Sequence, residues 1–153
     1  MRTLTCFVVA VAVLSQSPSA RQTPQTPASQ TPQAAPRIVG TMSELMVDII
    51  YPTSDAILYI STRTPTNQAE WNALEGKALM LAEAGNLLMM PGRARDERWM
   101  EDAKLMRDAA AAAFRAAKAK DVDALADLND AVYTSCTTCH QHYRPNYGRG
   151  QPR

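Results

Sequence analysis

The chain has little of what a β-sheet or a membrane-spanning helix requires. No stretch alternates apolar and polar residues over several positions, and clusters of β-branched residues are few, which argues against strands. The one long apolar run, Cys6 to Leu14, is much shorter than the roughly 20 residues that cross a bilayer. Helix-favouring residues such as Ala, Leu, Met, Glu, Lys and Arg are plentiful instead. An all-helical protein with no stable membrane anchor is therefore expected.

Both ends of the chain lack the pattern of a folded core. Residues 1–20 carry one positive charge at Arg2, then the apolar run and small residues, which is typical of a secretory signal peptide. Residues 21–40 are rich in Pro, Gln and Thr and are expected to form a disordered tether. The tail, 146–153, is expected to be loose. One compact domain is therefore predicted over residues 41–145.

An excess of charge of either sign is also missing. The chain has 16 Lys and Arg side chains against 15 Asp and Glu, and the loss of Arg2 with the signal peptide removes the difference. This balance predicts no nucleic-acid partner, and docking to another protein would have to use local patches.

Thiols and imidazoles are scarce, and all but one of them lie near the end of the chain. Cys6 is expected to leave with the signal peptide, so that Cys136, Cys139, His140 and His142 remain. Cys-x-x-Cys-His is the spacing by which haem c is attached covalently, with both thiols joined to the porphyrin and the imidazole bound to the iron. On a helix, Cys136, Cys139 and His140 share one face.

Two other uses of this motif fit less well. A redox-active dithiol usually opens a helix after a strand, whereas this pair lies near the end of a helical segment. A zinc site would need four ligands from seven consecutive residues, which cannot easily surround the metal as a tetrahedron. One covalent haem with its iron is therefore the favoured cofactor. Export agrees with it, and the periplasm is the expected compartment.

Prolines, glycines and capping residues divide the domain into four predicted helical segments. Pro52 should kink the first segment or split it just before Thr53. Four helices of about 20 residues with short connections predict an all-α, antiparallel up-down-up-down bundle with the haem near its C-terminal end. The segments run from Ser43 to about Thr62, from a capping box at Asn67 and Glu70 to Pro91, from Asp96 past Ala117, and from Asp121 to about Arg144.

With these features, the chain resembles the class II c-type cytochromes, the cytochrome c′ family, over residues 42–144. The most specific part is the ending from Cys136 to Arg144, which fits Cys-x-x-Cys-His-x-x-Tyr-Arg on the last helix. The resemblance implies that Tyr143 and Arg144 lie near the haem. It also implies a possible homodimer through the first two helices.

The far side of the iron decides between two functions in this family. Low-spin members take a methionine from the first helix as sixth ligand, and Met46 is predicted for this role, with Met42 as second choice. The predicted protein is an electron carrier, not an enzyme, with periplasmic redox proteins as partners. The alternative is a five-coordinate member that binds NO or CO at an open site walled by Leu45, Ile49 or Ile50. A subunit of a larger redox complex is a third class.

His142 is not expected to bind the iron. Two residues along a helix correspond to a rotation of about 200°, so that His142 should point away from the face of His140. We expect it to face solvent.

Overall fold

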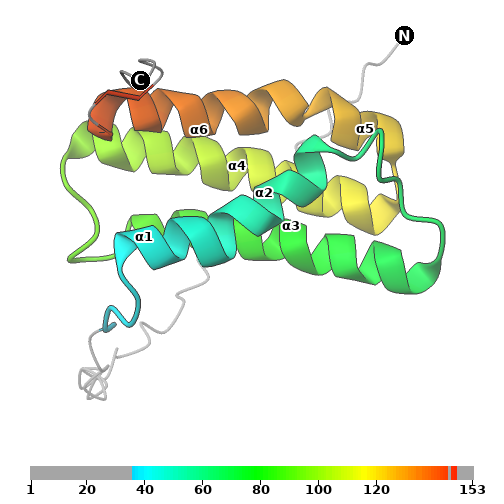
Figure 1. Ribbon diagram of the computed structural model, residues 1–153, viewed down its shortest axis with the longest axis horizontal. Coiled ribbons are helices and arrows are strands. Elements are labelled where there is room, and N and C mark those ends of the chain that lie inside the picture. The colour runs from blue at the N-terminus through cyan, green and yellow to red at the C-terminus, as the bar shows by residue number, and fades with distance from the viewer. Residues whose placement is uncertain (1–35, 145, 148–153) are drawn as a thin grey trace, which may run out of the picture. The chain divides into compact units, whose positions relative to one another are not determined.

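The computed structural model of the protein describes residues 36–144, 146 and 147. The regular structure of these residues is entirely helical, as predicted (Figure 1). The predicted signal peptide, most of the tether and most of the tail lie outside the described residues. The elements are α1 (Met42–Glu44), the π-helical segment η1 (Leu45–Ile50), α2 (Tyr51–Leu58), α3 (Gln68–Leu88), α4 (Glu97–Ala119), α5 (Val122–Asp127) and α6 (Asn129–Tyr143).

The first predicted segment forms a run of helix in which α1, η1 and α2 follow one another without a gap. Pro52 falls in the first turn of α2, where its missing N–H costs little. Just before it the helix is wider, because the N–H of Tyr51 donates to the carbonyl of Met46, five residues back. The Thr53 hydroxyl donates to the carbonyl of Ile49 at 2.6 Å. The predicted interruption is therefore a change of hydrogen-bond pattern before Tyr51, not a break before Thr53.

The second and third segments form the two longest helices, α3 and α4. Their predicted caps are confirmed, since Asn67 accepts the N–H of Glu70 at 3.0 Å and Asp96 accepts the N–H of Trp99 at 2.8 Å. The Glu70 carboxylate accepts the N–H of Thr66 at 2.6 Å instead of that of Asn67, so the capping box differs by one residue from the prediction.

Glycine allows α3 and α4 to approach closely. A Cβ atom built on Gly85 would lie 2.7 Å from the Cβ of Arg107 and 3.0 Å from its Cα. A side chain at position 85 would collide with α4 unless the helices shifted, so Gly85 lies at a close approach of the two backbones.

The fourth predicted segment is divided in two, contrary to the expectation of one helix. α5 begins where Asp121 accepts the N–H of Ala124 at 2.9 Å, and it ends at Leu128. α6 then starts directly at Asn129, whose side-chain amide donates to the carbonyl of Leu58 at the end of α2, at 3.1 Å. The break thus coincides with a hydrogen bond to another helix, which helical periodicity cannot predict.

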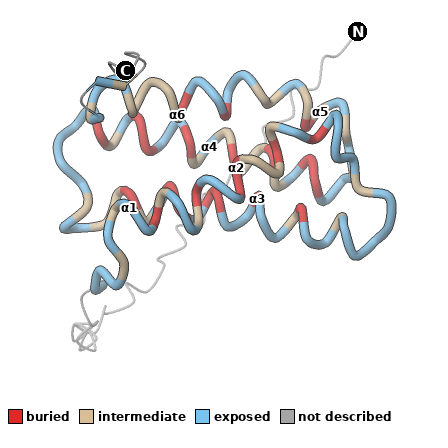
Figure 2. The backbone as a smooth tube through the Cα atoms, in the orientation of Figure 1, coloured by how far each residue is buried: buried red, intermediate tan, exposed pale blue. Residues whose placement is uncertain are grey.

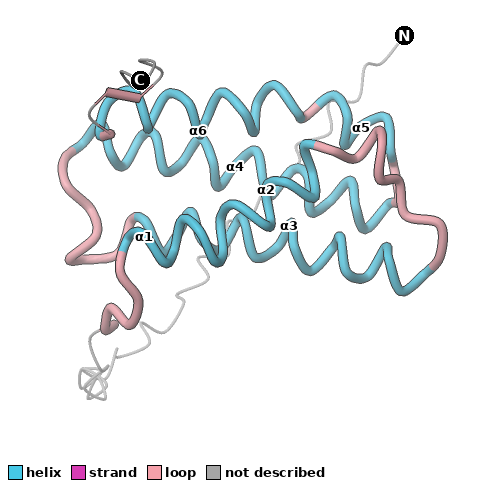
Figure 3. The backbone as a smooth tube through the Cα atoms, in the orientation of Figure 1, coloured by secondary structure: helices cyan, strands magenta, loops and turns pink. Residues whose placement is uncertain are grey.

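Together the four segments form the predicted four-helix bundle, with the connections at its two ends (Figure 3). The buried residues line the inner faces of the helices (Figure 2). None of the described helices is long and apolar enough to cross a membrane. The five largest fully buried side chains are Ile57, Ile60, Leu81, Leu125 and Val132.

Candidate functional site

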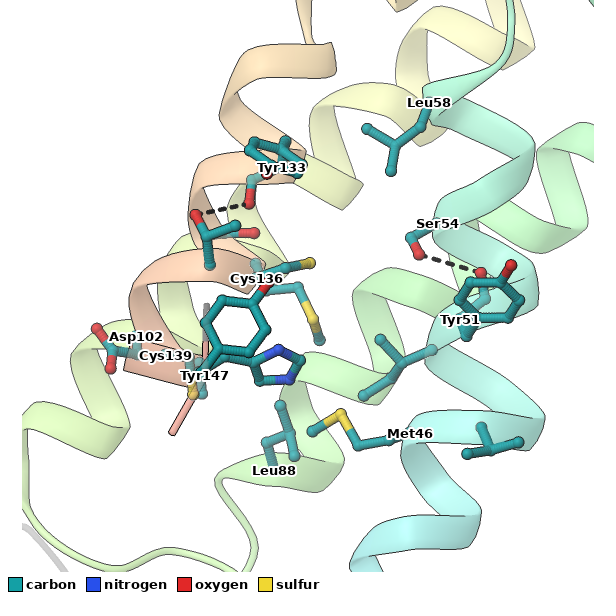
Figure 4. Close-up of a pocket in the computed structure, with 17 residues that line it drawn as sticks. Met46, Tyr51, Ser54, Leu58, Leu88, Asp102, Tyr133, Cys136, Cys139 and Tyr147 are labelled. Atoms are coloured by element: carbon teal, nitrogen blue, oxygen red, sulfur yellow. Dashed lines mark hydrogen bonds between the residues drawn. The ribbon is translucent and has the colours of Figure 1, made fainter. Parts of the chain in front are cut away.

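A cavity of about 460 Å³ lies between η1 and α2 on one side and α4 and α6 on the other (Figure 4). Cys136, Cys139 and His140 of α6 all line it, so the helix presents the three motif residues to one space. The volume is within the range of about 300 to 1,000 Å³ that is usual for cofactor sites. Most of the other lining side chains are apolar, among them Ile50, Leu88 and Met106, although the lining also includes Ser54 and Asp102.

Met46 lines the same cavity from η1, on the side opposite to the motif residues of α6. Figure 4 shows its side chain extending from η1 into the cavity, whose far side carries Cys139. Met42, one turn earlier, does not line this cavity but a smaller space of about 180 Å³, which Met46, Cys139 and His140 border as well. The structure therefore brings Met46 and His140 to one cavity and places Met42 beside it.

The residues expected to wall an open distal site are separated. Ile50 lines the main cavity, whereas Leu45 and Ile49 border a different space of about 370 Å³. The π-helical turn of η1 adds a residue to the ordinary helical repeat, which shifts the directions of side chains relative to an ideal α-helix. Helical spacing in the sequence cannot show this shift.

Comparison with known proteins bears on the same motif. The family model for Cytochrome C' matches residues 59–144, which is more than half of the chain. The chain belongs to the cytochrome c′ family. No curated protein and no solved structure matches it. Membership implies a covalently bound haem c with its iron, and the match includes the Cys-x-x-Cys-His motif but begins after Met46.

The motif residues fit that cofactor. Two thiols and an imidazole reach a largely apolar cavity from a single helix face, as covalent attachment and axial ligation require. The described residues contain no cluster of three or more His, Cys, Asp or Glu side chains that could hold a metal ion.

The environment of the thiols also differs from that of a redox-active dithiol. Burial raises the pKa of Cys136, and burial raises the pKa of Cys139 to about 11, with the negative charge of Asp102 as the next cause. Redox-active pairs depend on a thiol of lowered pKa. In this chain burial raises the pKa of both thiols instead, which is not the environment of a redox-active pair.

The surroundings of His140 favour its neutral imidazole form. Burial and, secondly, the positive charge of Arg144 lower its pKa. Its ring packs edge-on against Tyr147, with ring centres 4.9 Å apart and planes at 68°. Tyr147 also lines the main cavity, and the exposed Arg144 lies 5.8 Å above its ring. Tyr147 lies in the tail that was expected to be loose, four residues beyond Tyr143 at the end of α6, and no pattern in the sequence points to it.

Tyr143 lies beside the site and contacts α4. Its ring packs edge-on against Trp99 at 4.9 Å, and its hydroxyl donates to Asp96. Partial burial and the hydrogen bond to Asp96 raise its pKa to about 12. Tyr143 and Arg144 border the smaller space that His140 and Cys139 also line, and neither borders the main cavity.

His142 is exposed, as expected from its place on the helix, and it also contacts a neighbour. It does not line either space, and 31 % of its side chain is exposed. Its Nδ1 lies 2.7 Å from Oδ2 of Asp102, however, and that residue is only 4 % exposed. The helical rotation correctly excluded His142 from the site but could not show which neighbour it meets.

Proposed function

We propose that this protein carries single electrons in the periplasm, through a haem whose iron is bound by His140 and Met46. The observation that supports this best is that Met46 and His140 line the same cavity from different segments, η1 and α6. The bound haem would supply an iron that alternates between its ferric and ferrous states, at a potential raised by Met/His ligation.

The residues of the chain would hold this group in distinct ways. Cys136 and Cys139 would attach it covalently, and the neutral His140 ring would offer its nitrogen lone pair. Met46 would approach from the opposite wall with a soft thioether sulfur. No acid or base is required, because electron transfer breaks no bond in a substrate. Redox proteins are the proposed partners.

The second candidate is gas binding. It is favoured by the apolar wall of the cavity, since Ile50, Leu58 and Met106 would suit a small, weakly polar gas if the Met46 sulfur stayed off the iron. The two functions therefore differ in what Met46 does.

Spectra of the purified protein test the role of Met46. We expect the ferric form to show a near-infrared methionine-to-iron charge-transfer band that disappears in Met46→Ala, because the substitution removes the sulfur. Met42→Ala, in the matched methionine one turn earlier, should keep the band. The ferrous form should bind CO slowly, and Met46→Ala should make binding fast. Rapid CO binding that Met46→Ala leaves unchanged would refute the proposed ligation and favour gas binding.

A further inference from the structure

Asp102 is the one ionisable residue among the buried residues of the described chain. The other buried polar side chains, those of Thr53, Ser54 and Ser135, donate to carbonyls of their own helices. Asp102 instead has its partner on a different helix, at His142 of α6. A buried carboxylate is costly to keep unless it is paired, so this contact constrains how α4 and α6 pack.

The pair links the wall of the main cavity with the turn that carries the haem motif. Asp102 itself lines the cavity, and Figure 4 shows it close to Cys139. His142 follows Cys139 by three residues and His140 by two. A carboxylate can only accept a hydrogen bond, so Nδ1 of His142 is the donor over the 2.7 Å contact.

The neighbouring Tyr143 strengthens the same attachment. Its hydroxyl donates to Asp96, at the start of α4, and its ring packs on Trp99. The last turn of α6 therefore contacts α4 through residues 142 and 143 and faces the cavity through residues 139 and 140. A helix end held at two points cannot fray or rotate about its axis as freely as one that ends in solvent.

We infer that Asp102 is a positioning residue that acts through His142 to set the direction in which His140 meets the haem iron. The inference rests on the ligation by His140 proposed above. The orientation of an axial imidazole changes the electronic structure and the reduction potential of the iron, so the side chains that hold the ligand in place contribute to both. In this arrangement, Asp102 acts through a hydrogen bond and not through its charge alone.

Two variants separate the hydrogen bond from the charge. Asp102→Asn removes the charge but keeps an oxygen that can accept from His142. The double variant D102L/H142L removes both, and replacing a whole buried pair by apolar side chains is the change that such a site tolerates best. Asp55→Asn is the matched control, because it alters the Arg63–Asp55 pair, 2.6 Å long, which does not border the cavity.

Electron paramagnetic resonance of the ferric holoprotein and its reduction potential are the measurements. We expect D102L/H142L to shift the g-values and to change the ratio of ferric to ferrous protein at a fixed applied potential by about threefold or more, the size expected when contacting residues are coupled. Asp102→Asn and Asp55→Asn should stay close to the unaltered protein.

Two results would overturn the inference. If Asp102→Asn shifts both quantities as much as the double variant, the charge acts directly on the haem. If the double variant lowers the melting temperature but leaves the g-values and the potential unchanged, the pair only supports the fold. The near-infrared band of the unaltered ferric protein tests the proposed function separately, because it reports methionine ligation whatever these variants do.

Discussion

The two halves of the bundle differ in regularity. α3 and α4 are uninterrupted helices of 21 and 23 residues, each with a side-chain cap at its start. The helices that carry the motif and Met46 are both irregular, since η1 is π-helical and α5 is separated from α6 at Leu128. π-helical turns are frequent at functional sites, because they re-aim side chains without ending a helix.

The two halves therefore have different structural roles. The regular pair uses close backbone packing and an aliphatic interior, which suits a scaffold. The irregular segments also form hydrogen bonds to other helices, from Asn129 of α6 to Leu58 of α2 and between His142 of α6 and Asp102 of α4. Of the two irregular features, η1 lines the cavity through Met46, Val47 and Ile50, whereas the break at Leu128 precedes Tyr133, the first residue of α6 that lines it.

The largest expected effect on stability comes from a substitution in the regular half, where α3 packs on α4. Gly85→Ala forces a Cβ to within 2.7 Å of Arg107, so we expect the free energy of unfolding to fall by about 1 to 3 kcal/mol. Gly76→Ala is the control on the same helix, because no atom lies within 4 Å of its added Cβ, and it should stabilise the protein by about 0.5 to 1 kcal/mol. Denaturant midpoints measure both. Equal effects of the two substitutions would mean that the close packing is not required.

A smaller effect is expected from the irregular half. Asn129→Ala removes the hydrogen bond to Leu58, and we expect a loss of about 1 kcal/mol in the free energy of unfolding. Asn72→Ala, which removes an exposed contact with Gln68 within α3, should change it by less than about 0.5 kcal/mol. If Asn129→Ala has no effect on the denaturant midpoint, the junction between α5 and α6 does not depend on its contact with α2.

The smallest effect concerns pH. The hydrogen bond from Tyr143 lowers the pKa of Asp96 below its ordinary 3.8, and the N–H of Trp99 lowers it further. The ionised form is thus favoured in the folded protein, so this stability is fully present above about pH 4 and is lost as the pH falls through the lower, folded pKa. Tyr143→Phe should weaken this dependence, measured as the melting temperature against pH below 5. If the melting temperature of Tyr143→Phe falls with pH below 5 as it does in the unaltered protein, this contact is not a source of acid sensitivity.

The starts of helices were accessible from the sequence because caps are local. Asn67, Asp96 and Asp121 each accept an N–H three residues ahead, so the residue type and its place before an apolar pattern were sufficient. The motif from Cys136 to His140 is local for the same reason, because its three functional side chains lie within about one helical turn.

Long-range contacts were not accessible in this way. The hydrogen bond from Asn129 to Leu58 spans 71 residues and that from His142 to Asp102 spans 40. In neither case does a local sequence pattern around one residue predict its partner. Tyr147 was also missed, because a single aromatic residue beyond the last helix carries no periodicity.

By itself the sequence determined that this protein is helical, where α3, α4 and α5 start, and that one face of its last helix carries a haem-attachment motif, since all three depend on residues within a few positions of one another. Only the tertiary structure decided that Met46 and not Met42 lines the main cavity with His140, and that a buried Asp102 meets His142. Those outcomes depend on how separate helices rotate and pack together, and packing follows from the shapes of many side chains at once.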